Sequence, residues 1–463
     1  MTFGLGEELG PPMTPAHVLK PGMLYRGDNV KILKQMPAES VDLVYLDPPF
    51  FSNRNYEVIW GDEAEVRSFL DRWSGGIEVY IDWMRDRILE LHRVLAPTGS
   101  LYLHCDWHAS HYLKTMIDEV FGYRNFQNEI VWYYRGGGVS KFRWGRRHDV
   151  LLYYTKSHKK GEWTFNVDPV RMEYSPESQE RLKYKARSFR GDKVYEGYRP
   201  NPLGKHPDDV WSIQPLMPSN RKRLGYPTQK PEDLLKNVIL ASSNPGDLIL
   251  DPFCGCGTTL SVAQQTQRDW VGIDISPRAI DVCEDRLKAL GIRPEITGMP
   301  TTVEDLSSSE MGWHEFQNWV CHQLHATVSV KKSDDYGVDG RMILTHDPIQ
   351  VKQHQVGRPD VDAFQTAMER AGSDRGVMVG LGFSKQAREE VARARRRKNI
   401  EIIFCEAESL LKSEQRQHIV QQLQPGDEQL GIDEILAAMV PKQQIPVEDL
   451  IASELRRQRA GAS

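Results

Sequence analysis

The chain has 463 residues, of which 40% are hydrophobic, and its formal net charge is −5. This length is enough for two or three domains, and the hydrophobic content is enough for ordinary cores. No apolar run approaches the roughly 18 residues of a membrane span. No signal-peptide pattern follows Met1. We therefore expect a soluble cytoplasmic protein without membrane contact, and six cysteines without paired spacing argue against a disulfide framework.

The first informative segment is a predicted buried strand that ends in an acidic turn. Residues 41–46 are largely apolar, and the two prolines that follow cannot continue a strand ladder. Open α/β sheets bind their ligands at such strand ends. Asp47 and the Pro48 carbonyl offer acceptors for an exocyclic amine, and Phe50 offers a face for stacking. Asp47, Pro48, Pro49 and Phe50 are therefore candidate catalytic residues, with a plain turn as the alternative.

Three histidines follow the next strand pattern. His104 would end a strand at residues 101–104, while His108 and His111 would lie on the following helix. Because these positions belong to different elements, we interpret the three side chains as structural and not as a metal site.

Residues 135–230 are locally basic. They contain 21 Lys and Arg against 10 Asp and Glu, although the whole chain is slightly acidic. Aromatic side chains such as Trp144 and Trp211 interleave the basic ones, a composition suited to phosphates and bases. The plain alternative is a solvated charged face.

A second predicted strand, at residues 246–250, leads into a glycine-containing turn. Gly255 and Gly257 would let the backbone approach a ligand before a helix begins at Thr258. A third strand ends at Asp274, roughly 20 residues further on, the distance at which a carboxylate meets ribose hydroxyls in nucleotide-binding units. The glycine spacing and the lack of a Gly-Lys-Ser/Thr sequence disfavour NAD and ATP.

The order of these motifs resembles the β-class of DNA amino-methyltransferases. Asp-Pro-Pro-Phe is followed by a long insert, by Tyr-Pro-Thr-Gln-Lys-Pro at 226–231 and by Asp-Pro-Phe-x-Gly-x-Gly. The resemblance implies a Rossmann-like, doubly wound α/β domain at 23–292, with a target-recognition region inserted at about 135–225. It also implies double-stranded DNA as partner and S-adenosylmethionine as methyl donor. The flipped target base would be methylated at adenine N6, favoured over cytosine N4.

The same resemblance assigns roles to individual residues. The tetrapeptide at 47–50 would hold the target base. Asp28 would contact the cofactor adenine, Lys230 would lie near the cofactor carboxylate, and Asp274 would take the ribose hydroxyls. The full set of cofactor-binding candidates is Asp28, Lys230, Asp251, Phe253, Gly255, Gly257, Thr258 and Asp274.

A composition shift marks a second folding unit. Residues 293–311 are polar and predict a linker, followed by a unit at 312–415 and a tail at 416–463 to which no role is assigned.

This second unit carries a different candidate site. Asp339 precedes a strand pattern, and Gln350 and Lys352 alternate to one face of the next strand. Asp339 and Gln350 would offer oxygen ligands to Mg²⁺, and Lys352 would orient the attacking water. The arrangement resembles the Mrr-like branch of the PD-(D/E)xK nucleases, which implies a smaller α/β restriction-endonuclease-like domain.

Both resemblances together predict a single-chain restriction-modification or defence enzyme. The alternative is a methyltransferase whose C-terminal domain is inactive and only binds DNA or a partner. Methylation of RNA or of protein amides is a third reading, which the basic insert disfavours. The oligomeric state stays open, with a homodimer as one option.

Overall fold

The computed structural model describes residues 20–51, 76–136, 141–182, 188–190, 193–195, 201–216, 229–307, 311–328 and 337–423. These residues form two compact units, which divide between Met299 and Pro300. Much of the expected tail, parts of the expected insert and residues 226–228 lie outside the described ranges. No helix in the described ranges is both long and apolar enough to cross a membrane.

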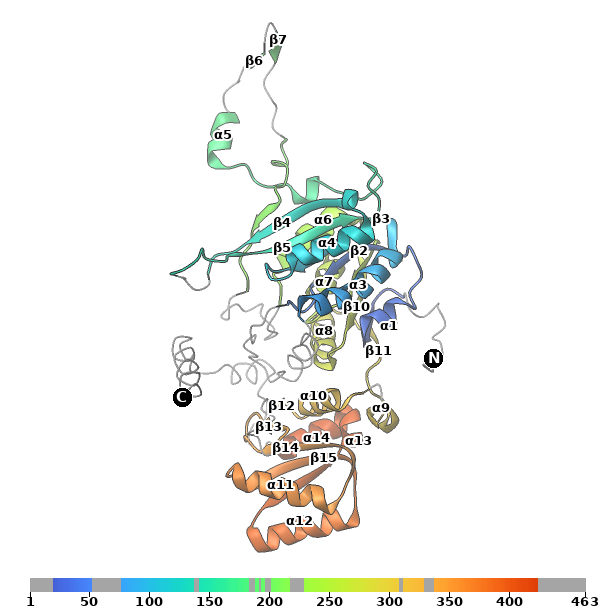
Figure 1. Ribbon diagram of the computed structural model, residues 1–463, viewed down its shortest axis with the longest axis vertical. Helices are drawn as coiled ribbons and strands as arrows, with labels where there is room; N and C mark the ends of the chain where they lie inside the picture. Colours follow the sequence, from blue (N-terminus) through green and yellow to red (C-terminus); the bar gives the residue numbers. More distant parts are fainter. Residues whose placement is uncertain are drawn as a thin grey trace. The chain divides into compact units, whose positions relative to one another are not determined.

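A nine-stranded sheet organises the first unit (Figure 1), in the order β11-β1-β10-β9-β2-β3-β5-β4-β8. The strands from β11 to β3 run parallel, β5 is antiparallel to β3 and β4, and β8 is parallel to β4. Their bounds are β1 Met23–Arg26, β2 Val41–Leu46, β3 Leu95–Cys105, β4 Phe126–Tyr133, β5 His148–Thr155, β8 Val210–Ser212, β9 Leu248–Asp251, β10 Asp269–Asp274 and β11 Glu295–Thr297. A separate hairpin pairs β6 (Ser188–Arg190) with β7 (Lys193–Tyr195).

Helices cover both faces of this sheet. The helices are α1 (Asn29–Leu33), α3 (Ile77–Val94), α4 (Ser110–Phe121), α5 (Pro176–Leu182), α6 (Glu232–Ser242), α7 (Thr258–Gln265) and α8 (Pro277–Ala289), with short 3-10 turns η2 (Tyr123–Asn125) and η3 (Asp168–Val170). One buried cluster joins the sheet to α1, α3 and α4, and the other joins it to α6, α7 and α8. The expected Rossmann-like, doubly wound α/β fold is confirmed.

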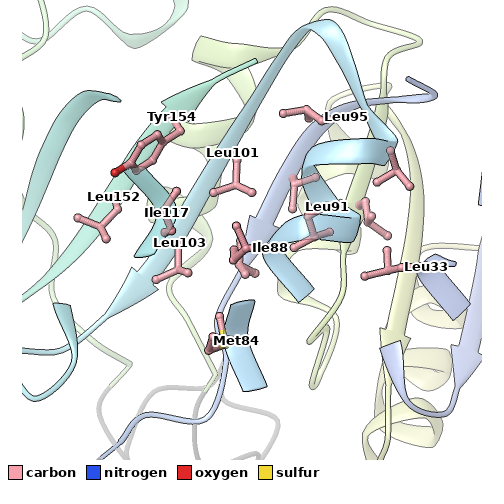
Figure 2. Close-up of a cluster of buried hydrophobic side chains, with 14 of the residues drawn as sticks. Leu33, Met84, Ile88, Leu91, Leu95, Leu101, Leu103, Ile117, Leu152 and Tyr154 are labelled. Atoms are coloured by element: carbon pink, nitrogen blue, oxygen red, sulfur yellow. The ribbon is translucent and has the colours of Figure 1, made fainter. Parts of the chain in front are cut away.

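Residue periodicity explains these two layers. In β2, Val44 and Leu46 enter one cluster while Leu43 enters the other, as expected for a strand that is buried on both faces. In α3, buried apolar residues recur at the spacing of one helix face, and Figure 2 shows Ile88 and Leu91 packed beside the strand residues of the same cluster.

The second unit is a smaller α/β fold. Its sheet has the order β12-β13-β14-β15-β16, with β14, β15 and β16 parallel and the first two strands antiparallel. The strands are β12 Ala326–Val328, β13 Gly340–Met342, β14 Pro348–Val356, β15 Arg375–Phe383 and β16 Glu401–Glu406. The helices are α9 Val303–Ser307, α10 Trp313–Gln323, α11 Arg358–Arg370, α12 Lys385–Lys398, α13 Ala407–Leu411 and α14 Ser413–Leu423. Separate cores lie on the two faces of the sheet.

The segment at 293–311 differs from a plain linker. Strand β11 pairs with β1 and extends the first sheet, so the first unit continues past residue 292. Helix α9 belongs to the second unit, where Leu306 is fully buried. At the other end, α14 continues past residue 415 and buries Leu423 in the same core. Apolar side chains within polar sequence explain why composition alone misplaces these boundaries.

Candidate functional site

The candidate catalytic and cofactor segments meet at one edge of the first sheet. Strands β2 and β9 are parallel neighbours, with Leu43 opposite Ile249 and Val44 opposite Leu250. Both therefore end on the same side, where Asp47 follows β2 and Asp251 closes β9. The helices that follow these strands, α3 and α7, pack on opposite faces of the sheet. Strand ends at such a switch in helix side are the usual ligand site of doubly wound folds. We call this side of the sheet the carboxyl edge.

Asp47 is held by two cationic or basic side chains. Its Oδ1 lies 2.8 Å from His104 Nδ1, and its Oδ2 forms an ion pair with Lys230 Nζ. Burial disfavours ionisation of this carboxyl, but Lys230 and His104 outweigh that effect and lower its pKa to about 2. Asp47 is thus a carboxylate with a fixed orientation and little basicity.

His104 lies between two acids. The side chain is 1% exposed, and its Nε2 is 3.6 Å from Asp149 Oδ2, too far for a hydrogen bond but close enough for charge attraction. Burial would lower the pKa of His104, yet Asp47 and Asp149 reverse this and raise it. The rings of Phe50 and Trp132 lie 5.0 Å and 5.4 Å from the imidazole centroid.

His104 and Asp149 were not predicted as functional residues. His104 was expected to be structural, and nothing in the local sequence distinguished Asp149. They meet because β3 and β5 are antiparallel, with His104 opposite Leu151. Within the described ranges, no group of three His, Cys, Asp or Glu side chains could hold a metal ion.

Lys230 contacts the segment that follows β2. Of the motif at 226–231, the structure describes residues 229–231, and Pro231 is the residue before the first turn of α6. The expectation for Lys230 was a position near the cofactor carboxylate. The structure pairs it with Asp47 and sets its Nζ 5.8 Å from the ring centroid of Phe50, and its charge also acts on Cys256 in the turn after β9, so the expectation stays a prediction.

The predicted cofactor residues also lie at the carboxyl edge. Asp251 is 2% exposed and accepts the Phe253 amide at 3.1 Å. Burial raises the pKa of Asp251 to about 7, and the negative charges of Asp47 and Asp274 add to this rise. The Gly255 amide donates to Asp274 Oδ2 at 2.8 Å, which ties the turn after β9 to the end of β10.

Position 257 requires a glycine because of its backbone conformation and because of a neighbouring side chain. Its φ is +71°, in the left-handed region, at the N-cap residue immediately before α7. A Cβ there would lie 2.3 Å from Cys283 Sγ. The next residue, Thr258, accepts a hydrogen bond from Arg286 Nη1 at 2.9 Å, so the helix start is fixed from α8.

Asp28 and Asn29 follow β1 and lie at the same carboxyl edge of the sheet. Asp28 Oδ1 caps α1 by accepting the Val30 amide at 2.8 Å, and its Oδ2 lies 3.1 Å from Arg87 Nη2. Asn29 donates to the Pro252 carbonyl at 2.8 Å, while its Oδ1 is buried and has no partner among the described residues. The sequence did not single out Asn29 or Arg87.

The second candidate site lies where β13 and β14 pair. Asp339 Oδ2 accepts the Val351 amide at 2.8 Å, and burial raises the pKa of Asp339 to about 6. Gln350 Nε2 donates to the Gly337 carbonyl at 2.8 Å, whereas its Oε1 is buried without a partner among the described residues. Lys352 is half-buried on the same strand and lowers the pKa of Asp339 by its charge.

Comparisons with known proteins agree with the division into two units. A model of a DNA methylase family matches residues 41–285, and a restriction endonuclease model matches residues 308–412. The DNA adenine methyltransferase YhdJ of Escherichia coli K12 is 33% identical over 267 residues, which cover 57% of this chain and 82% of that protein. The type II methyltransferase M.HpaI of Haemophilus parainfluenzae is 32% identical over 259 residues, covering 56% of this chain and 71% of that one.

Solved structures are similar over a comparable share of the chain. The cytosine-N4-specific PvuII DNA methyltransferase matches with a TM-score of 0.41 and 21% identity. The matched residues cover 58% of this chain and 86% of the PvuII enzyme. The complex of M1.HpyAVI with S-adenosylmethionine matches with a TM-score of 0.35 and 21% identity. The matched residues cover 57% of this chain and 98% of M1.HpyAVI.

Proposed function

This chain belongs to the DNA methylase family and carries a restriction-endonuclease-type domain, and we propose that it methylates the exocyclic amine of a base flipped out of duplex DNA, with S-adenosylmethionine as donor. The observation that carries the proposal is the adjacency of Asp47 and Asp251 at the ends of neighbouring parallel strands. One half of the carboxyl edge suits an amine and the other a nucleoside cofactor. Adenine N6 is the favoured target, supported by the aspartate form of the tetrapeptide and by the adenine methyltransferase among the relatives.

The residues of the cofactor half fit such a group. The backbone turn at Gly255 to Gly257 leads into the N-terminus of α7, and Asn29 offers a buried oxygen without a partner. Asp274 Oδ1 accepts the Ser276 amide and Oδ2 accepts the Gly255 amide, which fixes its carboxylate at the end of β10, where it would meet the ribose hydroxyls. The bound cofactor would supply an electrophilic methyl group on a sulfonium. Asp28, Asp251, Phe253 and Thr258 would line the remaining surface.

The target-base half orients the nucleophile. Asp47 and the Pro48 carbonyl would accept hydrogen bonds from the two amine N–H groups, while Pro49 shapes the turn and Phe50 stacks on the base. Because the pKa of Asp47 is about 2, the carboxylate directs the amine without removing its proton. The amine nitrogen would supply the electron pair of the new N–C bond while the methyl–sulfur bond breaks and its electron pair stays on sulfur, which leaves as a neutral thioether. The proton would leave afterwards to water, when the methylated nitrogen has become acidic. His104 and Lys230 would hold the carboxylate in place.

The test uses the full chain, unmodified duplex DNA and S-adenosylmethionine with a tritiated methyl group. We expect label in DNA, N6-methyladenine in the digest by mass spectrometry, and loss of both in Asp47→Ala. A digest dominated by N4-methylcytosine would overturn the choice of base. Absence of label from varied duplexes, together with failure to bind the donor in calorimetry, would overturn the function.

For the second unit we propose Mg²⁺-dependent cleavage of DNA. Asp339 and Gln350 would provide one carboxylate and one amide oxygen, and the unpartnered Gln350 Oε1 supports this donor set. The ion would supply charge stabilisation and an activated water. Lys352 would orient that water. A single-chain restriction-modification system then needs cleavage that is blocked by its own mark or released by a trigger.

Asp339→Ala and Lys352→Ala separate this proposal from a module that only binds DNA. We expect both variants to lose Mg²⁺-dependent nicking of unmethylated plasmid and to keep methylation. Wild-type chain that never nicks, with or without methylation, would favour the binding module. Preferential cutting of the self-methylated plasmid would overturn the restriction-modification role.

A further inference from the structure

The connection between β4 and β5 leaves the sheet beside Asp47. Strand β5 is antiparallel to β3, with Val150 opposite Cys105, so β5 begins at the carboxyl edge and β4 ends there. Two contacts fix the base of this connection. The Tyr134 amide donates to the Arg147 carbonyl at 2.9 Å, and the Arg146 guanidinium lies 3.4 Å from the centroid of the Trp107 ring, just after β3.

Residues 141–147, one of the two described parts of this connection, present aromatic rings to solvent. Phe142 is 97% exposed and Trp144 is 95% exposed, the two highest values among the exposed large hydrophobic residues of the described chain. Large apolar rings in this state are costly in water and indicate a binding surface. The stretch contains no acidic residue and four basic ones, which are Lys141, Arg143, Arg146 and Arg147.

Charge decides which partner this surface fits. A second copy of the chain would bring two clusters of four like charges together across a symmetric contact, which is repulsive. A duplex offers phosphates for the basic side chains and base faces for the rings. Trp144 is three residues from Arg147, so it reaches at most about 11 Å beyond the paired end of the hairpin, enough to enter a groove about 8.5 Å deep.

We propose that Trp144 inserts into the DNA at the target site and stacks in the gap left by the flipped base. The inference rests on the proposed methyltransferase function and adds a base-displacing role for this hairpin. Flipping breaks the target base pair and leaves a gap in the stack, and an aromatic ring that enters the gap stacks there and keeps the pair from re-forming. Stacking of one base on an aromatic ring corresponds to about a 5- to 150-fold effect.

The experiment compares two duplexes with the full-length protein, after sequencing of DNA modified by the wild type has located a methylated site. In one duplex the target base is paired normally, and in the other it faces an abasic position, so that flipping breaks no base pair. We expect Trp144→Ala to lower kcat/KM by about 10- to 100-fold on the paired duplex and by less than about 3-fold on the abasic one. Trp144→Phe, which keeps a ring, should retain most of the activity on both.

Tyr123→Ala is the matched control. Tyr123 is 68% exposed but precedes β4, so it lies at the opposite edge of the sheet and its removal should change neither rate. Equal rates of Trp144→Ala and wild type on the paired duplex would overturn the proposed insertion of Trp144 and leave the methyltransferase function intact. An equal loss on both duplexes, with melting temperature and cofactor affinity unchanged, would overturn it in favour of a groove contact. No labelling by the wild type would overturn the proposed function itself.

Discussion

The Nδ1 of His104 and the Oδ1 of Asp47 lie 2.8 Å apart, and this contact sets the direction of the carboxylate at the end of β2. We expect His104→Leu to lower the methylation kcat about 100-fold, because a displaced acceptor misaligns the amine. His104→Asn keeps an N–H donor near the Nδ1 position and should retain roughly tenfold more activity than His104→Leu. Single-turnover methylation measures both, and KM for the cofactor should stay near the wild-type value.

His92→Asn serves as control for these variants. His92 is a half-buried histidine in the last turn of α3, packed on Phe121 away from the carboxyl edge. It should leave kcat unchanged. If His104→Leu and His104→Asn lose the same activity, hydrogen bonding to Asp47 is not what His104 contributes.

Asp251 predicts a dependence of stability on pH. Its pKa is raised to about 7 by burial, so between its ordinary pKa of about 3.9 and pH 7 the folded protein binds this proton and the unfolded chain does not. Stability therefore falls as pH rises through this window. Asp251→Asn removes the titration. The melting temperature of this variant minus that of wild type should therefore be a few degrees higher at pH 8 than at pH 5. A difference that stays constant between the two pH values would contradict the assignment.

Gly257 allows a test of the turn before α7. Gly257→Ala should destabilise the first unit by about 2–5 kcal/mol, the sum of left-handed strain and overpacking against Cys283. Adding Cys283→Ala removes the sulfur and leaves the Cys283 Cβ at 3.3 Å from the new methyl, so part of the loss should be recovered. Urea unfolding of the two single variants and the double variant gives the coupling energy, expected at about 1–3 kcal/mol.

Gly246→Ala is the matched control for that series. Gly246 also has a positive φ, of +87°, but nothing lies within 4 Å of its added Cβ. Only the backbone strain should appear, about 1–2 kcal/mol. If Gly246→Ala costs as much as Gly257→Ala, contact with Cys283 is not the cause.

Asp339 predicts how the proposed nuclease responds to acidity. Burial raises the pKa of Asp339 to about 6, and its protonated form is a poor ligand for Mg²⁺. Nicking at a fixed, subsaturating Mg²⁺ concentration should therefore decrease as pH falls through about 6, and additional Mg²⁺ should restore it. Plasmid nicking assays across pH 5 to 8 measure this response. Acid inactivation that no concentration of Mg²⁺ reverses would point to another group.

Local sequence predicts the strands that carry the site better than it predicts their partners. Residues 41–46 form β2 as expected, because β-branched and aromatic residues with prolines behind them define a buried strand end. The contact of His104 with Asp47 depends on the parallel pairing of β2 with β3, and its approach to Asp149 depends on the antiparallel pairing of β3 with β5. No local pattern encodes either pairing. The same holds for Lys230, whose partner Asp47 is 183 residues away.

The two side chains that neutralise Asp47 leave the ribosome at very different times. His104 follows soon after the acid, but Lys230 emerges only when the whole intervening insert has been synthesised. Until Lys230 has been synthesised, His104 is the only one of these two side chains present to offset the charge of Asp47. Lys230 and α6 are synthesised about halfway along the chain, and only then is the set of side chains around Asp47 complete.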